Sequence, residues 1–139
     1  MENNIDEVNI FANCKNTKEQ GNIGLGEAIR YFTSKRMTVS LPLNDSQDYD
    51  LVVEDCDGNL KKVQVKTTNY KHRRYFAVNL RVSGGNSKKN YVHKMNTEIN
   101  YDWLFVLCAN GDEYIIEKEI IKNLKNEISL NSYGKFKIN

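Results

Sequence analysis

Apolar residues first recur at helical spacing. Leu25, Ile29 and Phe32 follow one another at helical offsets, so we predict a helix from about residue 18 or 23 to residue 35. Three glycines weaken its start, because glycine inside a helix lowers stability. Close packing of another backbone segment against these glycines is the expected compensation.

The next apolar runs are short and alternate with polar residues, which is typical of strands. Residues 37–41 form the first run, and Pro42, the only proline, ends it. Two further runs, residues 49–53 and 62–66, are separated by a segment rich in turn formers. This arrangement predicts a β-hairpin.

The second half of the chain continues in the same manner. Residues 74–82 predict another strand and residues 83–90 a flexible basic loop. Residues 103–109 are apolar throughout, which predicts a strand in the centre of a sheet. A tight turn leads into a strand at residues 113–117 and a short helix at residues 118–125. This order predicts an α/β or α+β fold with a central mixed sheet.

The length of 139 residues predicts one domain, with residues 1–17 as a loose N-terminal segment. No apolar run approaches the length of a membrane span, and the first residues lack the basic start and apolar stretch of a signal peptide. We therefore expect a cytoplasmic protein. The three cysteines are far apart and odd in number, so they indicate neither a disulfide framework nor a zinc site.

The net charge of +2 conceals an uneven distribution of charge along the chain. Residues 41–59 contain six acids and no base, whereas residues 60–94 contain ten bases and no acid. A basic segment of this kind carries a strong positive field, whose natural partner is a polyanion. The alternative is that some of these bases merely solvate strand faces and a loop.

The predicted hairpin carries the polar residues with the clearest chemistry. Gln64 and Lys66 point to the same face of their strand, because side chains alternate. If Asp50 faces that side too, a carboxylate, a carboxamide oxygen and an ammonium group converge. Such a site can hold a divalent cation beside an attacking water, which suits phosphodiester hydrolysis. Glu27, on the preceding helix, could reach this hairpin. The alternative is a surface hairpin with scattered polar residues.

Five short segments of the chain form a recognisable series: Gly26-Glu27-Ala28, Val39 to Leu43, Tyr49 to Val53, Val63 to Thr68 and, more weakly, Ile99 to Trp103. In order and spacing they resemble the PD-(D/E)XK nucleases. They are most similar to a small branch that includes a cyanobacterial group I intron homing endonuclease, with archaeal Holliday junction resolvases as more distant relatives. The resemblance implies a restriction-endonuclease-like α/β core with a central mixed β-sheet flanked by helices.

The resemblance also implies roles for individual residues. Asp50 would be the central metal ligand, joined by Gln64, the backbone carbonyl of Val65 and, through a water molecule, Glu27. Gln64 stands where the family usually has a second acid, so reduced metal affinity is expected. Lys66 would orient or help deprotonate the attacking water and offset charge on the phosphate. The implied cofactor is Mg²⁺, with Mn²⁺ able to substitute.

These roles predict a metal-dependent DNA endonuclease that hydrolyses phosphodiester bonds in duplex or branched DNA. Cleavage of a duplex needs two active sites, so we expect a homodimer or higher homo-oligomer. Three alternatives stay open: a nuclease-fold module that binds nucleic acid with little or no cleavage, a structure-selective junction resolvase, and an interaction domain without a nucleic-acid partner. The expected DNA contacts are Lys61, Lys62, Thr67, Thr68, Lys71, Arg73, Arg74, Arg81, Lys88 and Lys89.

Overall fold

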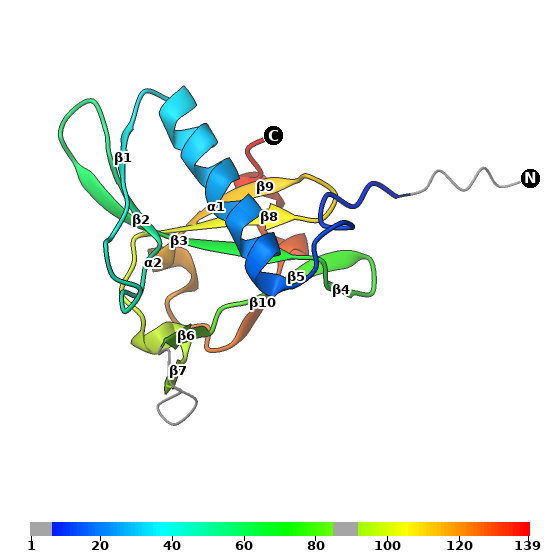
Figure 1. Cartoon of the computed structure of the whole chain (residues 1–139). Coiled ribbons are helices and arrows are strands. Elements are labelled where there is room, and N and C mark those ends of the chain that lie inside the picture. The colour runs from blue at the N-terminus through cyan, green and yellow to red at the C-terminus, as the bar shows by residue number, and fades with distance from the viewer. Residues whose placement is uncertain (1–6, 85–91) are drawn as a thin grey trace, which may run out of the picture.

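The computed structural model of the chain describes residues 7–84 and 92–139 (Figure 1). Its centre is a five-stranded sheet in the order β1-β2-β3-β8-β9. The pair β3–β8 is parallel and the other neighbouring pairs are antiparallel, so the sheet is mixed, as predicted. The strands are β1 (Thr38–Ser40), β2 (Leu51–Glu54), β3 (Leu60–Thr68), β8 (Trp103–Cys108) and β9 (Glu113–Glu117).

Smaller elements surround this sheet. Three strands form a second sheet in the order β10-β5-β4, while β6 and β7 pair with each other. These strands are β4 (Lys71–His72), β5 (Tyr75–Asn79), β6 (Val82–Gly84), β7 (Val92–Lys94) and β10 (Glu127–Ser129). Besides the long helix α1 (Thr17–Ser34), the helices are α2 (Lys118–Ile121) and the 3₁₀ helices η1 (Asn96–Glu98) and η2 (Leu130–Phe136).

The long helix α1 packs on one face of the central sheet (Figure 1). Ala28 and Phe32 of the helix are buried in one cluster with Val63 of β3 and Phe105 of β8. The apolar residues predicted at helical spacing therefore do face a core. No helix within residues 7–84 and 92–139 combines the length and apolar character needed to cross a membrane.

Gly24 allows α1 to approach β3 closely. A Cβ atom at this position would lie 2.4 Å from Cγ2 of Thr67, a distance at which one of the two segments must move. Gly21 and Gly26 have no atom within 4 Å of such a Cβ. Of these three glycines, Gly24 therefore provides the close packing that the sequence predicts.

The opposite face of the sheet carries a second core. Leu104 and Val106 of β8 are buried there with Val78 of β5 and Ile128 of β10. Since Phe105 points into the first core, β8 is covered on both faces, which explains its uninterrupted apolar sequence.

Three sequence predictions of secondary structure need correction. The predicted strand at residues 74–82 is divided, because β5 ends at Asn79 and the backbone N–H of Arg81 donates to the Asn79 side chain. The predicted helix at residues 118–125 ends at Ile121. Of the predicted basic loop, residues 85–90 lie outside the described residues, and Ser83 and Gly84 belong to β6.

A pair of carboxyl groups connects α1 with β9. The Glu27 carboxylate accepts a hydrogen bond from Arg30 at 3.1 Å, and Glu113 is buried. A hydrogen bond from Glu113 lowers the pKa of Glu27, whereas burial and that same hydrogen bond raise the pKa of Glu113 to about 7. The two carboxyl groups therefore hold one proton between them near neutral pH.

We expect Gly24→Ala to lower the free energy of unfolding by about 1–3 kcal/mol, because the added methyl group overpacks the α1–β3 contact. Gly26→Ala is the matched control: it lies in the same helix with open space around it and should raise the free energy by up to about 1 kcal/mol. Urea unfolding followed by tryptophan fluorescence measures both values. Equal effects of the two substitutions would contradict the close packing.

The Glu27–Glu113 pair should make stability depend on pH. The folded state keeps the Glu113 proton up to about pH 7, whereas the unfolded state releases it near the ordinary pKa of 4.5, so the free energy of unfolding falls as the pH rises through this window. Glu113→Gln should flatten that fall. Urea titrations between pH 4.5 and 8 test this, and parallel pH dependences of variant and wild type would exclude a shared proton.

Candidate active site

The two faces of β3 have different chemistry. Val63 and Val65 pack towards α1, so alternation directs Gln64 and Lys66 to the opposite face. Asp50 immediately precedes β2, and its backbone N–H donates to the carbonyl of Val63 at 2.8 Å. This hydrogen bond continues the β2–β3 pairing and places Asp50 beside the Gln64 segment.

The side chain of Asp50 meets Gln64 and the backbone of Val65. Its Oδ2 accepts hydrogen bonds from Gln64 Nε2 at 2.8 Å and from the Val65 N–H at 2.7 Å. Gln64 Nε2 also lies 3.4 Å from the carbonyl oxygen of Val65. The structure therefore brings together three of the four residues that the family resemblance implies for the metal site, Asp50, Gln64 and Val65.

This arrangement fits a divalent cation. The Gln64 amide nitrogen lies between two oxygen acceptors, Asp50 Oδ2 and the Val65 carbonyl oxygen, where positive charge is favoured. Rotating the carboxamide exchanges its nitrogen and oxygen, which would place a third oxygen beside the Asp50 and Val65 oxygens. Oxygen ligands suit Mg²⁺. Residues 7–84 and 92–139 contain no group of three or more His, Cys, Asp or Glu placed to bind a metal, so neutral oxygens would have to complete this ligand set.

Burial and mutual attraction act in opposite directions on the charges of Asp50 and Lys66. Burial raises the pKa of Asp50, while the Val65 N–H and the Lys66 charge lower it. Burial lowers the pKa of Lys66, while Asp50 raises it. Each group is thus shifted towards its neutral form but keeps an oppositely charged neighbour, a combination that often marks a functional site.

Lys66 is also held by a turn that the sequence did not indicate. Its Nζ donates to the backbone carbonyl of Arg81 at 2.5 Å. Arg81 is held in turn by Asn126, whose Oδ1 accepts a hydrogen bond from the Arg81 Nε at 3.0 Å. No local pattern reveals this connection, because Arg81 and Asn126 are 45 positions apart.

Glu27, which the sequence predicts to reach the hairpin, makes its side-chain contacts elsewhere in this structure. Its carboxylate contacts Arg30 and Glu113. Glu113 begins β9, which is separated from β3 by β8. The helix packs on the sheet with Glu27 directed towards the edge strand β9.

The two threonines after Lys66, predicted as phosphate contacts, have hydrogen-bond partners within the domain. Thr68 is buried and its hydroxyl group donates to the backbone carbonyl of Ala77 at 2.5 Å. Thr67 faces α1, and its hydroxyl group accepts a hydrogen bond from the Gln20 side chain at 3.0 Å. Both hydroxyl groups therefore serve packing within the domain.

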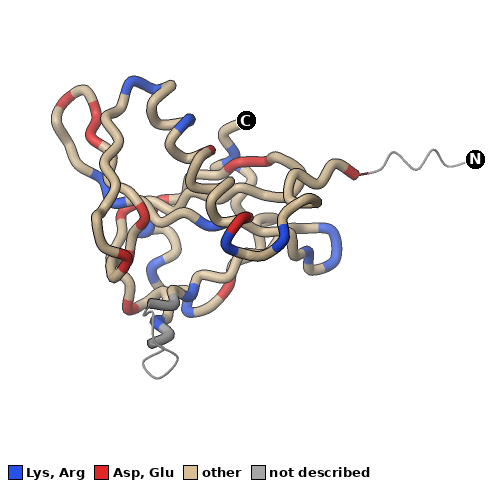
Figure 2. The backbone as a smooth tube through the Cα atoms, viewed as in Figure 1, with Lys and Arg blue, Asp and Glu red and all other residues tan. Residues whose placement is uncertain are grey.

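The bases that the sequence concentrates in one segment are distributed in space (Figure 2). Lys61 and Lys62 lie at the start of β3, and Lys71 lies beyond its other end with Arg73 and Arg74. Predicted contacts Lys88 and Lys89 lie outside the described residues.

Acids distant in the sequence pair with some of these bases. The Glu7 carboxylate forms an ion pair with Lys71 Nζ at 2.5 Å, and the Asp48 carboxylate forms one with Lys94 Nζ at 3.0 Å. Tertiary structure therefore partly offsets the charge of the acid-free segment.

Comparison with known proteins places these features in a family. A sequence model described as PD-(D/E)XK endonuclease matches residues 15–135. The solved structure of a bacterial homing endonuclease, I-Ssp6803I, is similar with a TM-score of 0.66 and 27% sequence identity, over 82% of this chain and 77% of that chain. The search of curated proteins found no match. Because the family match includes the long helix, the Asp50 hairpin and β8, the chain belongs to the PD-(D/E)XK endonuclease family.

Proposed function

We propose that this protein is a Mg²⁺-dependent endonuclease that hydrolyses phosphodiester bonds in DNA. The observation that carries the proposal is that Asp50 Oδ2 and the Val65 carbonyl oxygen both contact the Gln64 carboxamide. Family membership and the similarity to a homing endonuclease support a nuclease reaction. Lys66 lies on the same face of β3 and would provide a positive charge for phosphodiester hydrolysis.

Asp50, Gln64 and Val65 would hold the Mg²⁺ ion through one carboxylate and two carbonyl oxygens. When bound, the ion would supply positive charge next to the scissile phosphate and lower the pKa of a water molecule. Asp50 is already fixed by the N–H of Val65, so little reorganisation of the backbone is needed. The Gln64 carboxamide must rotate to present its oxygen.

Lys66 would act on the attacking water and on the phosphate. Burial lowers the pKa of its ammonium group, which makes proton exchange near neutral pH easier than for an exposed lysine. In its charged form it would stabilise negative charge that develops on the phosphate in the transition state. The Arg81 carbonyl restricts the position of Nζ, so the group is already oriented.

The partner would be duplex or branched DNA, bound by cations near both ends of β3. Phosphate contacts of this kind give affinity without sequence selection. Cleavage of both strands would require a homodimer or a higher homo-oligomer. Comparing a linear duplex with a four-way junction separates a duplex nuclease from a structure-selective resolvase.

The neutral Gln64 favours one alternative, a nuclease-fold module that binds nucleic acid with little or no cleavage. The Gln64 amide already donates a hydrogen bond to the Asp50 carboxylate, so this carboxylate has a partner without a cation. Metal titration followed by calorimetry distinguishes the two functions. Intact DNA binding without Mg²⁺ or Mn²⁺ binding would favour the module.

Lys66→Ala should reduce Mg²⁺-dependent nicking of supercoiled plasmid by about 10²-fold or more, because it removes a charge positioned for the transition state. DNA affinity should stay nearly unchanged. Lys122→Ala, which removes an exposed lysine paired with Glu119, is the matched control and should nick at the wild-type rate. Wild-type nicking by Lys66→Ala would remove the role assigned to Lys66.

Gln64→Glu should tighten Mg²⁺ binding by about tenfold or more, because a second carboxylate then faces the ion. Without metal, repulsion between the introduced carboxylate and Asp50 should lower the unfolding temperature in EDTA, and Mg²⁺ should restore it. Gln64→Met, similar in length but without the oxygen, should weaken Mg²⁺ binding. Calorimetry and thermal unfolding test this, and equal Mg²⁺ affinity in all three proteins would mean that the ion binds elsewhere.

A further inference from the structure

A narrow β-hairpin carries two consecutive arginines at its tip. His72 of β4 pairs with Tyr75 of β5, which leaves Arg73 and Arg74 as the turn. All four residues are exposed. The hairpin lies beyond the C-terminal end of β3 at the periphery of the molecule (Figure 1), and Figure 2 shows basic residues gathered there.

Arg73 occupies a backbone conformation that favours glycine. Its φ angle is 60°, as the first position of a two-residue hairpin turn requires, and glycine or asparagine is usually found there. A long cationic side chain at this position lowers stability relative to glycine. Arg36, at the end of α1, has a similar φ of 63°, so it offers a matched comparison.

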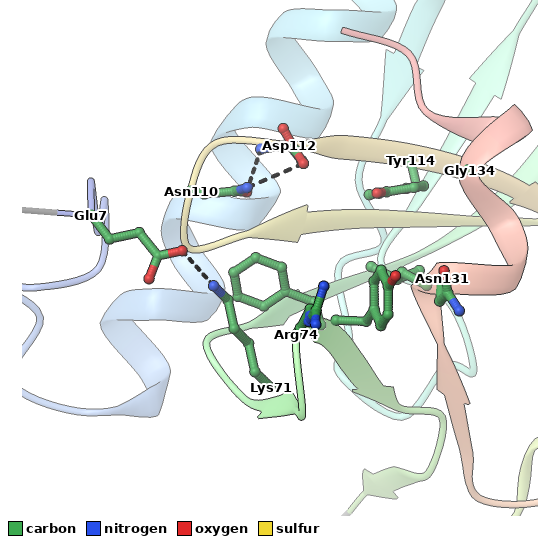
Figure 3. Close-up of a pocket in the computed structure, with 11 residues that line it drawn as sticks. Glu7, Lys71, Arg74, Asn110, Asp112, Tyr114, Asn131 and Gly134 are labelled. Carbon is green, nitrogen blue, oxygen red and sulfur yellow. Dashed lines mark hydrogen bonds and ion pairs between the residues drawn. The ribbon is translucent and has the colours of Figure 1, made fainter. Parts of the chain in front are cut away.

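The other cations of the hairpin lie against the rest of the protein. Lys71 Nζ binds Glu7 and lies 4.9 Å from the centre of the Phe76 ring. Arg74 lines a pocket of about 350 Å³ together with Asp112 and other residues (Figure 3). Within residues 7–84 and 92–139, neither arginine of the turn forms an ion pair, but Arg74 lies against the pocket, so Arg73 is the tip cation left for a partner.

We propose that the β4–β5 hairpin enters the major groove of DNA and that Arg73 reads a guanine there. This inference rests on the proposed DNA endonuclease function. The major groove admits a two-stranded β-ribbon, and an arginine at its tip can donate two hydrogen bonds to O6 and N7 of guanine. A flat basic surface would meet phosphates, whereas a two-residue tip flanked by exposed side chains is narrow enough to reach base edges.

The covalent chain limits where this guanine lies. Arg73 follows Lys66 by seven positions, which span at most about 24 Å when extended. At about 3.4 Å per base pair, the distance corresponds to about seven base pairs. The long side chains of Lys66 and Arg73 extend this reach, so the guanine read by Arg73 should lie within about one helical turn, about ten base pairs, of the cleaved phosphate.

The test separates binding from cleavage. Asp50→Asn protein, which should bind without cutting, is mixed with a pool of duplexes of random sequence at low salt, and the bound duplexes are sequenced. Arg73→Gly is then added to this protein, since glycine suits the local φ. Arg36→Gly in the same background is the matched control, because it removes an arginine at a similar φ at the end of α1.

The Asp50→Asn protein should enrich duplexes with guanine at one or two adjacent positions, and methylation of guanine N7 there should weaken binding. Arg73→Gly should remove this preference and weaken binding to the selected duplex by about tenfold, with little effect on random duplexes. Arg36→Gly should keep the preference.

Three outcomes would overturn the inference. The first is the absence of a guanine preference in the Asp50→Asn protein, and the second is unchanged selection by Arg73→Gly. The third is an equal loss of affinity for all duplexes with a smaller salt dependence, which indicates a phosphate contact. Failure of the proposed function is seen separately, as absence of plasmid nicking by the wild-type protein. A protein that selects guanine through Arg73 without nicking would keep the hairpin inference and reject the endonuclease.

Discussion

The parallel pairing of β3 with β8 is the constraint on which the site depends. The pairing runs from Val63 with Trp103 to Thr68 with Cys108, and β8 is buried on both faces. A shift of one residue would turn the apolar side chains of β3 away from α1 and bring Gln64 and Lys66 against the helix. Burial of Val63 therefore fixes the side of the sheet on which the polar residues lie.

Asp102 and Ala109 extend this pairing at both ends. Asp102 accepts a hydrogen bond from the Lys62 N–H through its side chain and donates its own N–H to the Lys62 carbonyl. Ala109 donates its N–H to the carbonyl of Thr68. Between these two ends, β3 is long enough to carry Gln64 and Lys66 at its middle and to lead into the Arg73 hairpin.

The site is built mainly from hydrogen bonds to the backbone. Asp50 is fixed by the Val65 N–H, and Lys66 is fixed by the Arg81 carbonyl. Such contacts orient both charged groups, and the neutral Gln64 amide lies between the Asp50 carboxylate and the Val65 carbonyl oxygen. Only one acid stands at the centre of the site, so the proposed binding of a cation would depend on geometry more than on net charge.

The sequence alone determined the helix, the Asp50 hairpin, the central strand and the common face of Gln64 and Lys66, because side-chain periodicity and turn residues act over a few positions. Tertiary structure decided the partners of Glu27 and the inward direction of Thr67 and Thr68. It also decided the pairing of Glu7 and Asp48 with the basic segment and the support of Lys66 by Arg81. These contacts depend on how the helix is rotated on the sheet and on where distant loops meet. Packing of the whole core determines both, so no local sequence pattern can predict them.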